Sequence, residues 1–264
     1  MSEPVKTSHI ETKPLILWED AHFLALWKPL GFVCEEDHKG RGVPQWLRSH
    51  RPDLVTAEGL PGLLHRLDAP VTGVLLLGKT PQAIEKGMAL FKGREISKIY
   101  WAWVEGRQPY PKGRLKHYLS RPEQATGKVK CSNEPFTDSR EALLDFEILF
   151  QAERYTCLTI RLLTGRTHQI RAQLAKTGFP VKGDLKYGAK RSNPGGGIAL
   201  HSRALEFTHP ITGEKIRVRA KPPQDALWDL LPPRFSTRKL YRWSDEQVAQ
   251  SRNPAQRASK ATKR

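Results

Sequence analysis

Short strand-like segments, separated by turns rich in glycine and proline, restrict the possible folds more than any other feature of this sequence. Residues 99–104 and 158–163 alternate between two sets of side chains with a period of two, which is typical of β-strands. Residues 74–77 form a continuous apolar run that suits a buried strand. Residues 81–92 and 167–176 place apolar side chains at helical spacing. The pattern predicts one α+β domain.

Two hairpins are expected at the ends of this domain. Residues 15–19 and 23–27 are strand-like and flank the turn Asp20-Ala21-His22. Residues 201–207 and 215–220 flank a turn that contains proline and glycine. We therefore expect a flexible N-terminal segment at residues 1–13, one folded domain at residues 14–231 and a basic, flexible tail at residues 232–264.

The charge of the chain indicates a polyanionic partner. Lys and Arg number 44 against 27 acidic residues, which gives a formal net charge of +17. The tail from residue 232 onward holds nine basic and two acidic residues, so the rest of the chain keeps most of the excess. A surplus of this kind fits binding to the phosphate backbone of a nucleic acid. Basic surfaces can also be merely solvated.

The remaining composition points to a soluble protein of the reducing cytoplasm. No apolar run approaches the roughly 18 to 20 residues needed to cross a bilayer. The N-terminus lacks the apolar core of a signal peptide, and the cysteines Cys34, Cys131 and Cys157 are far apart. This spacing argues against both a disulfide framework and a zinc site. Without heptads or an amphipathic partner helix, we expect a monomer with no obligatory protein partner.

Three segments place ionisable residues at turns or beside strands, where rigid elements can hold chemical groups in position. The first is His65-Arg66-Leu67-Asp68, which leads into Thr72-Gly73. The second begins Lys98-Ile99-Tyr100, and the third is Gly165-Arg166-Thr167-His168-Gln169-Ile170-Arg171. An ionised aspartate can act as a nucleophile or base on a glycosidic bond without a metal or redox cofactor. Because burial favours the protonated form of a carboxylate, such a site also needs a fixed cation nearby.

Together these segments resemble the three signature motifs of the RluA family of RNA pseudouridine synthases. Residues 17–31, 178–188 and 200–214 extend the resemblance in the family's order, so that it covers about residues 14–222. It implies the pseudouridine synthase fold, an α+β structure in which a mixed, largely antiparallel sheet bears a basic cleft. It also implies an isomerase that converts uridine in structured RNA, ribosomal or transfer, to pseudouridine without a cofactor or metal.

The resemblance implies a role for each residue that matches a motif. Asp68 matches the nucleophile, Arg171 the arginine that keeps it charged, and Tyr100 the tyrosine that stacks on the target base. Arg66 matches the arginine that helps to displace the target nucleotide from its stack, and Ile170 matches an apolar pocket residue. The other residues expected to bind substrate are His65, Thr72, Arg166, His168 and Gln169.

Seven of these ten residues also have an ordinary structural explanation. Asp68 before Pro70 could shape a turn, Arg171 could be a solvated helix residue, and Tyr100 could simply fill the core. Arg66 could form a surface salt bridge, and Ile170 fits a core position equally well. For His65 and His168 we favour structural hydrogen bonding, because neither has a second metal ligand at helical spacing.

The sequence departs from the family pattern in three places. The run Ala69-Pro70-Val71 replaces the polar residues that many members carry after the aspartate, so the loop's contacts with RNA are expected to differ. Residues 114–140 match only loosely, and we expect loops that determine substrate choice there. Many members have a small N-terminal RNA-binding domain, but only about 13 residues precede the first hairpin here. We therefore expect that domain to be absent.

Two other classes of function remain as alternatives. A non-catalytic RNA-binding protein could keep the fold, but it would have no need for the set of Asp68, Tyr100 and Arg171. A basic hydrolase or nuclease could use Asp68 with His65, but it would need further carboxylates to bind a metal, and Glu58 is the only nearby candidate. The sequence does not separate attack on the sugar from attack on the base.

Overall fold

The structure is a computed structural model that describes residues 13–57, 59–233 and 235. The predicted terminal segments therefore lie almost entirely outside the described residues, and so does Glu58. The strands are β1 (Leu15–Glu19), β2 (Phe23–Lys28), β3 (Gly62–Leu63), β4 (Thr72–Gly78), β5 (Ser97–Glu105), β6 (Lys112–Leu119), β7 (Cys131–Ser132), β8 (Arg140–Gln151), β9 (Tyr155–Leu162), β10 (Leu200–Thr208) and β11 (Lys215–Arg219). The helices are α1 (Val43–His50), α2 (Pro81–Gly93) and α3 (Gln169–Lys176), and 3-10 turns lie at Pro52–Leu54, Leu185–Tyr187 and Trp228–Leu230.

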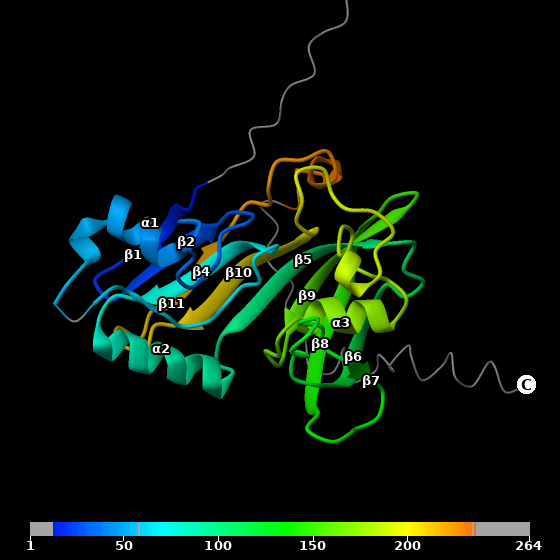
Figure 1. Cartoon of the computed structure of the whole chain (residues 1–264), viewed down its shortest axis with the longest axis horizontal. Coiled ribbons are helices and arrows are strands. Elements are labelled where there is room, and N and C mark those ends of the chain that lie inside the picture. Colours follow the sequence, from blue (N-terminus) through cyan, green and yellow to red (C-terminus); the bar gives the residue numbers. More distant parts are fainter. Residues whose placement is uncertain (1–12, 58, 234, 236–264) are drawn as a thin grey trace, which may run out of the picture.

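The described strands form one sheet that crosses the molecule from β1 to β7 (Figure 1). Its main order is β1-β2-β4-β10-β5-β9-β8-β6-β7, with β3 and β11 paired to β4 and β10. The contact between β4 and β10 is parallel, whereas the other strand pairs are antiparallel. The predicted mixed, largely antiparallel sheet is therefore confirmed. No helix in the described part of the chain is both long and apolar enough to span a bilayer.

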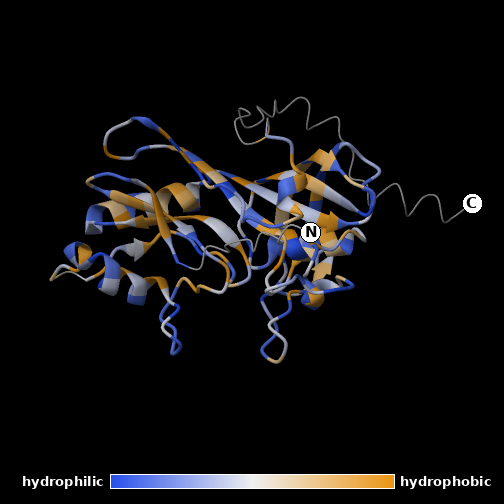
Figure 2. Ribbon diagram, turned by 90° about the horizontal axis from the view of Figure 1, so that it is seen from above, coloured by the Kyte–Doolittle hydropathy of each residue, from blue (hydrophilic) through white to orange (hydrophobic). Residues whose placement is uncertain are grey.

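The two faces of the sheet carry different clusters of buried side chains. Residues Leu24, Leu75 and Tyr100 of one face pack with α1 and α3 in the largest cluster. On the opposite face, residues such as Phe23 and Val74 pack against α2. This arrangement follows from the alternation of side chains along each strand. Figure 2 shows the apolar residues concentrated on the strands and the hydrophilic ones on the projecting loops.

The predicted hairpins and the first predicted helix form as expected. β1 pairs with β2 around the Asp20 turn, where Asp20 Oδ1 accepts hydrogen bonds from the amides of His22 and Phe23. β10 pairs with β11. Helix α2 begins with Pro81 after Thr80, whose Oγ1 accepts from the amide of Ala83 and so caps the helix.

Other elements differ from the sequence prediction. Helix α3 begins at Gln169 rather than Thr167, because His168 adopts a left-handed conformation with a φ of 52°. Helix α1 was not expected, since it has only eight residues and carries a proline in its first turn. The region at residues 114–140, where loops that determine substrate choice are expected, also contains most of β6 and all of β7, and β6 pairs with β8 over eight residues. Loops remain between these strands.

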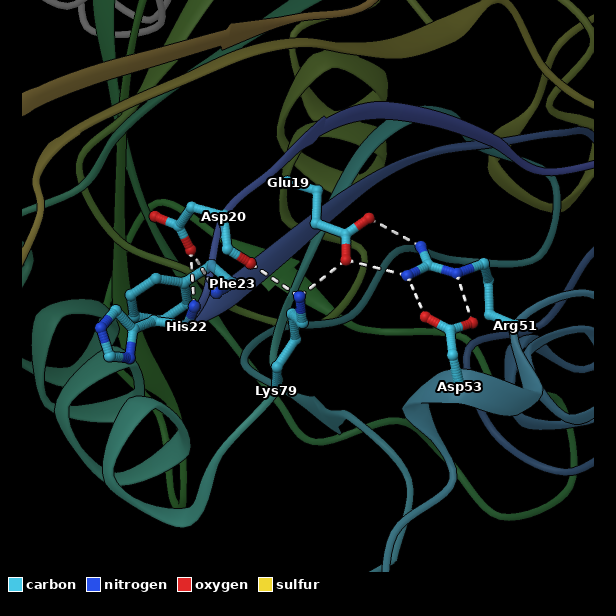
Figure 3. Close-up of polar contacts among 7 residues, drawn as sticks. All are labelled: Glu19, Asp20, His22, Phe23, Arg51, Asp53 and Lys79. Atoms are coloured by element: carbon cyan, nitrogen blue, oxygen red, sulfur yellow. Dashed lines mark hydrogen bonds and ion pairs between the residues drawn. The ribbon is translucent and has the colours of Figure 1, made fainter.

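A charged network fastens the first hairpin to the rest of the domain (Figure 3). The carboxylate of Glu19 accepts from both terminal nitrogens of Arg51, at 2.7 and 2.9 Å, and from Lys79 Nζ at 2.7 Å. Arg51 also binds Asp53, and Lys79 Nζ donates to the carbonyl of Asp20. The network therefore joins the end of β1 to the segment after α1 and to the end of β4.

Candidate active site

Asp68 lies in the turn that enters β4, and neighbouring segments hold the main chain of this turn. The amide of Val71 donates to the carbonyl of Asp68. The carbonyl of Ala69 accepts from the amide of Gly31 and from Lys28 Nζ, and the Sγ of Cys34 lies within hydrogen-bonding distance of the amide and carbonyl of Leu67. The side chain of Asp68 remains 27% exposed. It is thus a carboxylate on a fixed turn that a ligand can reach.

Arg171, in the first turn of α3, is the cation next to Asp68. Its Nη1 donates to Asp68 Oδ2 at 2.9 Å, while Nε and Nη2 donate to the two oxygens of Asp184 at 2.6 and 3.0 Å. Burial disfavours the charged form of Arg171, but the two carboxylates outweigh it and raise the pKa of Arg171 above its ordinary value. The guanidinium is therefore charged and oriented toward Asp68.

His168 contacts the same carboxylate from another direction. Its Nε2 lies 3.6 Å from Asp68 Oδ2, and its Nδ1 lies 2.9 Å from the hydroxyl of Tyr187, which accepts from the amide of Val129. Burial lowers the pKa of His168, an effect that the charge of Asp68 partly opposes. If Tyr187 donates to Nδ1, the neutral imidazole carries its proton on Nε2, facing Asp68.

Tyr100 projects from β5 into the cluster that contains Leu67 and Ile170. Burial raises the pKa of its phenol well above the ordinary value; the charge of Asp68 adds to this effect and a hydrogen bond with Ser202 opposes it. The phenol is therefore protonated at neutral pH. Only 7% of Tyr100 is exposed, so its ring packs in the core on the same face of the sheet as the Asp68 turn.

The structure brings some of the other predicted residues to this centre and not others. Ile170 lies in the cluster around Tyr100. Arg66 is largely exposed and pairs with Glu35 at 2.8 Å, so its side chain is accessible beside the Asp68 turn. Gln169 is buried, and its Oε1 accepts from the amide of Arg166 and from Thr164 Oγ1. Gln169 thus fixes the loop that carries Arg166.

His65 and Thr72 have internal partners instead. The Nε2 of His65 accepts from the amide of Leu76, and its ring stacks on Phe91 with centroids 4.7 Å apart. Burial lowers the pKa of His65 to about 3, so this ring is neutral. The hydroxyl of Thr72 is buried and lies 2.8 Å from Nδ1 of His201. Both contacts fit a structural role rather than the predicted binding of substrate.

Three residues of the site were given no role from the sequence: Lys28, Asp184 and Tyr187. All three lie in segments that resemble the family, and the only local signal was the pair Gly183-Asp184 followed by Tyr187-Gly188. The sequence does not show that Arg171 is buried, so its need for carboxylate partners is known only from the structure. Within residues 13–57, 59–233 and 235, no group of three or more His, Cys, Asp or Glu side chains could hold a metal ion.

Known proteins of one family are similar to this chain. The model of a family described as RNA pseudouridylate synthase matches residues 22–176. The "Uncharacterized RNA pseudouridine synthase YlyB" of Bacillus subtilis is 32% identical over 214 residues, covering 80% of this chain and 69% of that protein. The "Ribosomal large subunit pseudouridine synthase D" of Pseudomonas aeruginosa is 32% identical over 237 residues, covering 81% and 69%.

Solved structures share the fold. The structure named "Human RNA Pseudouridylate Synthase Domain Containing 4" superposes with a TM-score of 0.66 at 20% sequence identity, covering 81% of this chain and 91% of that one. The structure named "Human RNA Pseudouridylate Synthase Domain Containing 1" gives the same TM-score and identity, covering 90% and 94%. These likenesses establish the pseudouridine synthase fold.

Proposed function

The chain belongs to the RNA pseudouridylate synthase family and is an isomerase that acts on RNA, and from this premise we propose that Asp68 is its nucleophile. The observation that carries the proposal is the ion pair between Asp68 and Arg171, with Tyr100 on the same face of the sheet. A partly exposed carboxylate beside a buried, fixed cation is available for attack on a nucleotide.

In the proposed reaction, Asp68 attacks the nucleotide at the sugar or at the base, and the bond between N1 and C1′ breaks. The uracil turns within the site, and a bond forms between C5 and C1′. The bond between Asp68 and the nucleotide breaks, which releases Asp68 as a carboxylate. The proton leaves C5, and N1 gains one, so that the product is an isomer of the substrate. Tyr100 provides a surface for the base, and Arg171 keeps Asp68 ionised. No step requires a metal or a redox cofactor.

We propose ribosomal RNA of the large subunit as the first substrate to test, with transfer RNA as the alternative. The names of several relatives, including the Pseudomonas aeruginosa protein, specify the large ribosomal subunit. The excess of basic residues supports a structured RNA partner of either kind. In this proposal Arg66, whose side chain is exposed beside the Asp68 turn, contacts the nucleotides around the target.

The test is detection of pseudouridine by mass spectrometry after incubation with protein-free ribosomal RNA or transfer RNA. We compare the wild type, Asp68→Asn, and the matched control Asp229→Asn, which alters an exposed aspartate near the end of the domain. We expect conversion by the wild type and by the control, and none by Asp68→Asn. Conversion by Asp68→Asn would show that another group is the nucleophile. Binding of both RNAs without conversion by any of the three proteins would favour a non-catalytic RNA-binding protein.

A further inference from the structure

Lys98, two residues before Tyr100 on β5, is a half-buried cation for which no anionic partner is found among the described residues. Side chains at positions i and i+2 of a strand point to the same face, so Lys98 and Tyr100 share the face on which Asp68 lies. The Nζ of Lys98 lies over Gly165, only 3.2 Å from the position that a Cβ atom there would occupy. Lys98 therefore turns toward the loop that leads to His168 and Arg171.

Other positive charges surround Lys98. Burial lowers the pKa of Lys98, and the charges of Arg94 and Arg166 lower it further. Burial also lowers the pKa of Arg166, and Arg140 and Arg94 add to the effect. These four cations come from separate places in the fold: the end of α2, the start of β5, the start of β8 and the loop before α3.

The described residues supply little negative charge to this group. Glu141 is the carboxylate whose charge acts on Arg166, but its Oε2 binds Lys116 Nζ at 2.9 Å. Glu95 follows Arg94 in the chain, with its carboxylate beside Gly93. Arg166 Nε donates to the main-chain carbonyl of Glu141, a neutral acceptor. The carbonyl end of α2 favours a cation at Arg94, but that accounts for one charge of the four. A cluster of like charges beside a catalytic centre is stabilised when an anion binds there.

We propose that Lys98 and Arg166, flanked by Arg94 and Arg140, form a binding site for a phosphodiester group of the RNA strand next to the target uridine. The inference rests on the proposed function, since it takes RNA as the ligand. Arg166 is two residues from His168, which faces Asp68, and Lys98 is two residues from Tyr100. A phosphate held between them lies close enough to fix the position of the neighbouring nucleotide.

The test is the salt dependence of binding to a short single-stranded RNA that contains one central uridine, followed by fluorescence anisotropy. Each lost phosphate contact lowers the slope of log K against log salt by about 0.7 for single strands. Because the two residues hold one phosphate, we expect a smaller slope for Lys98→Gln and for Arg166→Gln, and a decrease of about 0.7 for the double variant. The matched control is Lys215→Gln, which removes an exposed charge from β11 and should leave the slope unchanged.

Measurements of unfolding distinguish phosphate binding by Lys98 from a structural role of this residue. Because Lys98 lies among like charges, Lys98→Gln should leave the midpoint of urea unfolding unchanged or raise it. An unchanged slope in both single variants would overturn the proposal, as would a lower urea midpoint of Lys98→Gln accompanied by an unchanged slope. The binding assay does not depend on catalysis. If the wild type forms no pseudouridine but the slopes fall as expected, the phosphate site stands and the proposed function fails.

Discussion

Arg171 donates to Asp68 at 2.9 Å although 103 residues separate them in the chain. The Nε and Nη2 atoms of Arg171 donate to the two carboxylate oxygens of Asp184. One buried arginine thus spans a partly exposed carboxylate and a fully buried one. The buried partner determines the direction in which the guanidinium faces, and the exposed partner stays accessible to a ligand.

Asp184→Asn should slow the chemical step more than it weakens RNA binding. The amide nitrogen of Asn cannot accept a hydrogen bond from the guanidinium, so one of the two hydrogen bonds is replaced by an unfavourable contact between two donors. We therefore expect Arg171 to lose its orientation. We expect at least a tenfold lower single-turnover rate with RNA affinity unchanged, and a loss of stability of about 3 kcal/mol. Rapid-quench kinetics and anisotropy would measure the two effects separately. A rate equal to that of the Asp229→Asn control, well below the unfolding temperature, would mean that Arg171 is positioned without Asp184.

Glu19→Gln should reduce stability at neutral pH but not in strong acid. The ion pair with Arg51 lowers the pKa of Glu19 to about 2; Lys79 assists, and burial opposes (Figure 3). A carboxylate with a lowered pKa stabilises the fold above its unfolded pKa and loses that contribution as the pH falls toward the folded value. Because the side chain of Glu19 is 24% exposed, we expect Glu19→Gln to lower the free energy of unfolding by about 1 to 2 kcal/mol near neutral pH. In urea unfolding, the difference in stability between the wild type and Glu19→Gln should disappear between about pH 4.5 and pH 2. Glu153→Gln, which alters an exposed pair, is the control.

His201 should make the fold sensitive to mild acid. It is fully buried between Thr72 Oγ1 and the carbonyl of Ala220, and burial lowers its pKa to about 3. The unfolded chain therefore takes up a proton near pH 6.5 while the folded chain does not, so stability falls as the pH drops below 6.5. The expected loss from this one group is about 2 kcal/mol near pH 5. Denaturant titrations of His201→Gln should show a smaller decrease over the same range. Equal decreases in both proteins would assign the acid sensitivity to other groups.

Gly73→Ala should prevent stable folding. Gly73 has a φ of 117°, and a Cβ at this position would lie 2.2 Å from the main-chain oxygen of Ser202, in the parallel contact between β4 and β10. Backbone atoms within a sheet cannot move aside, so we expect a loss of more than about 3 kcal/mol. Circular dichroism and urea unfolding measure it. Gly93→Ala is the control, because its Cβ would meet only the flexible end of Glu95. Similar stability of both variants would contradict the predicted clash.

The residues on which the chemistry rests could be predicted from the sequence because they lie in contiguous motifs. Asp68, Tyr100 and Arg171 were identified in this way, and so were both hairpins and helix α2. Their roles remain predictions, but their placement at one centre is a finding of the structure. The partners of these residues were harder to predict. A buried arginine needs several acceptors, and which carboxylate supplies them depends on folding of the segment after α3.

The elements that could not be predicted owe their existence to contacts that are distant in sequence. Strand β6 has the weak pattern Lys112-Gly113-Arg114, and it becomes a strand by pairing with β8. Inside β8, Asp145 is fully buried, a position that is tolerable because Arg114 and Arg161 bind its two oxygens. Local propensity indicates neither the pairing nor the buried charge. The order of the strands could not be predicted either, because it depends on the position of β10 between β4 and β5.

Strand β10 lies between β4 and β5, yet it is synthesised long after both; Ser202 and its hydrogen-bonding partner Val74 are 128 residues apart. On a translating ribosome, β4 and β5 therefore emerge as unpaired edges and must wait for a third strand to join them. Until then, the turn that carries Asp68 and the strand that carries Tyr100 have no fixed relation. We expect an incomplete nascent chain to bind RNA through its charges without modifying it. The candidate active site is thus assembled only after β10, near the end of the described domain, has been made.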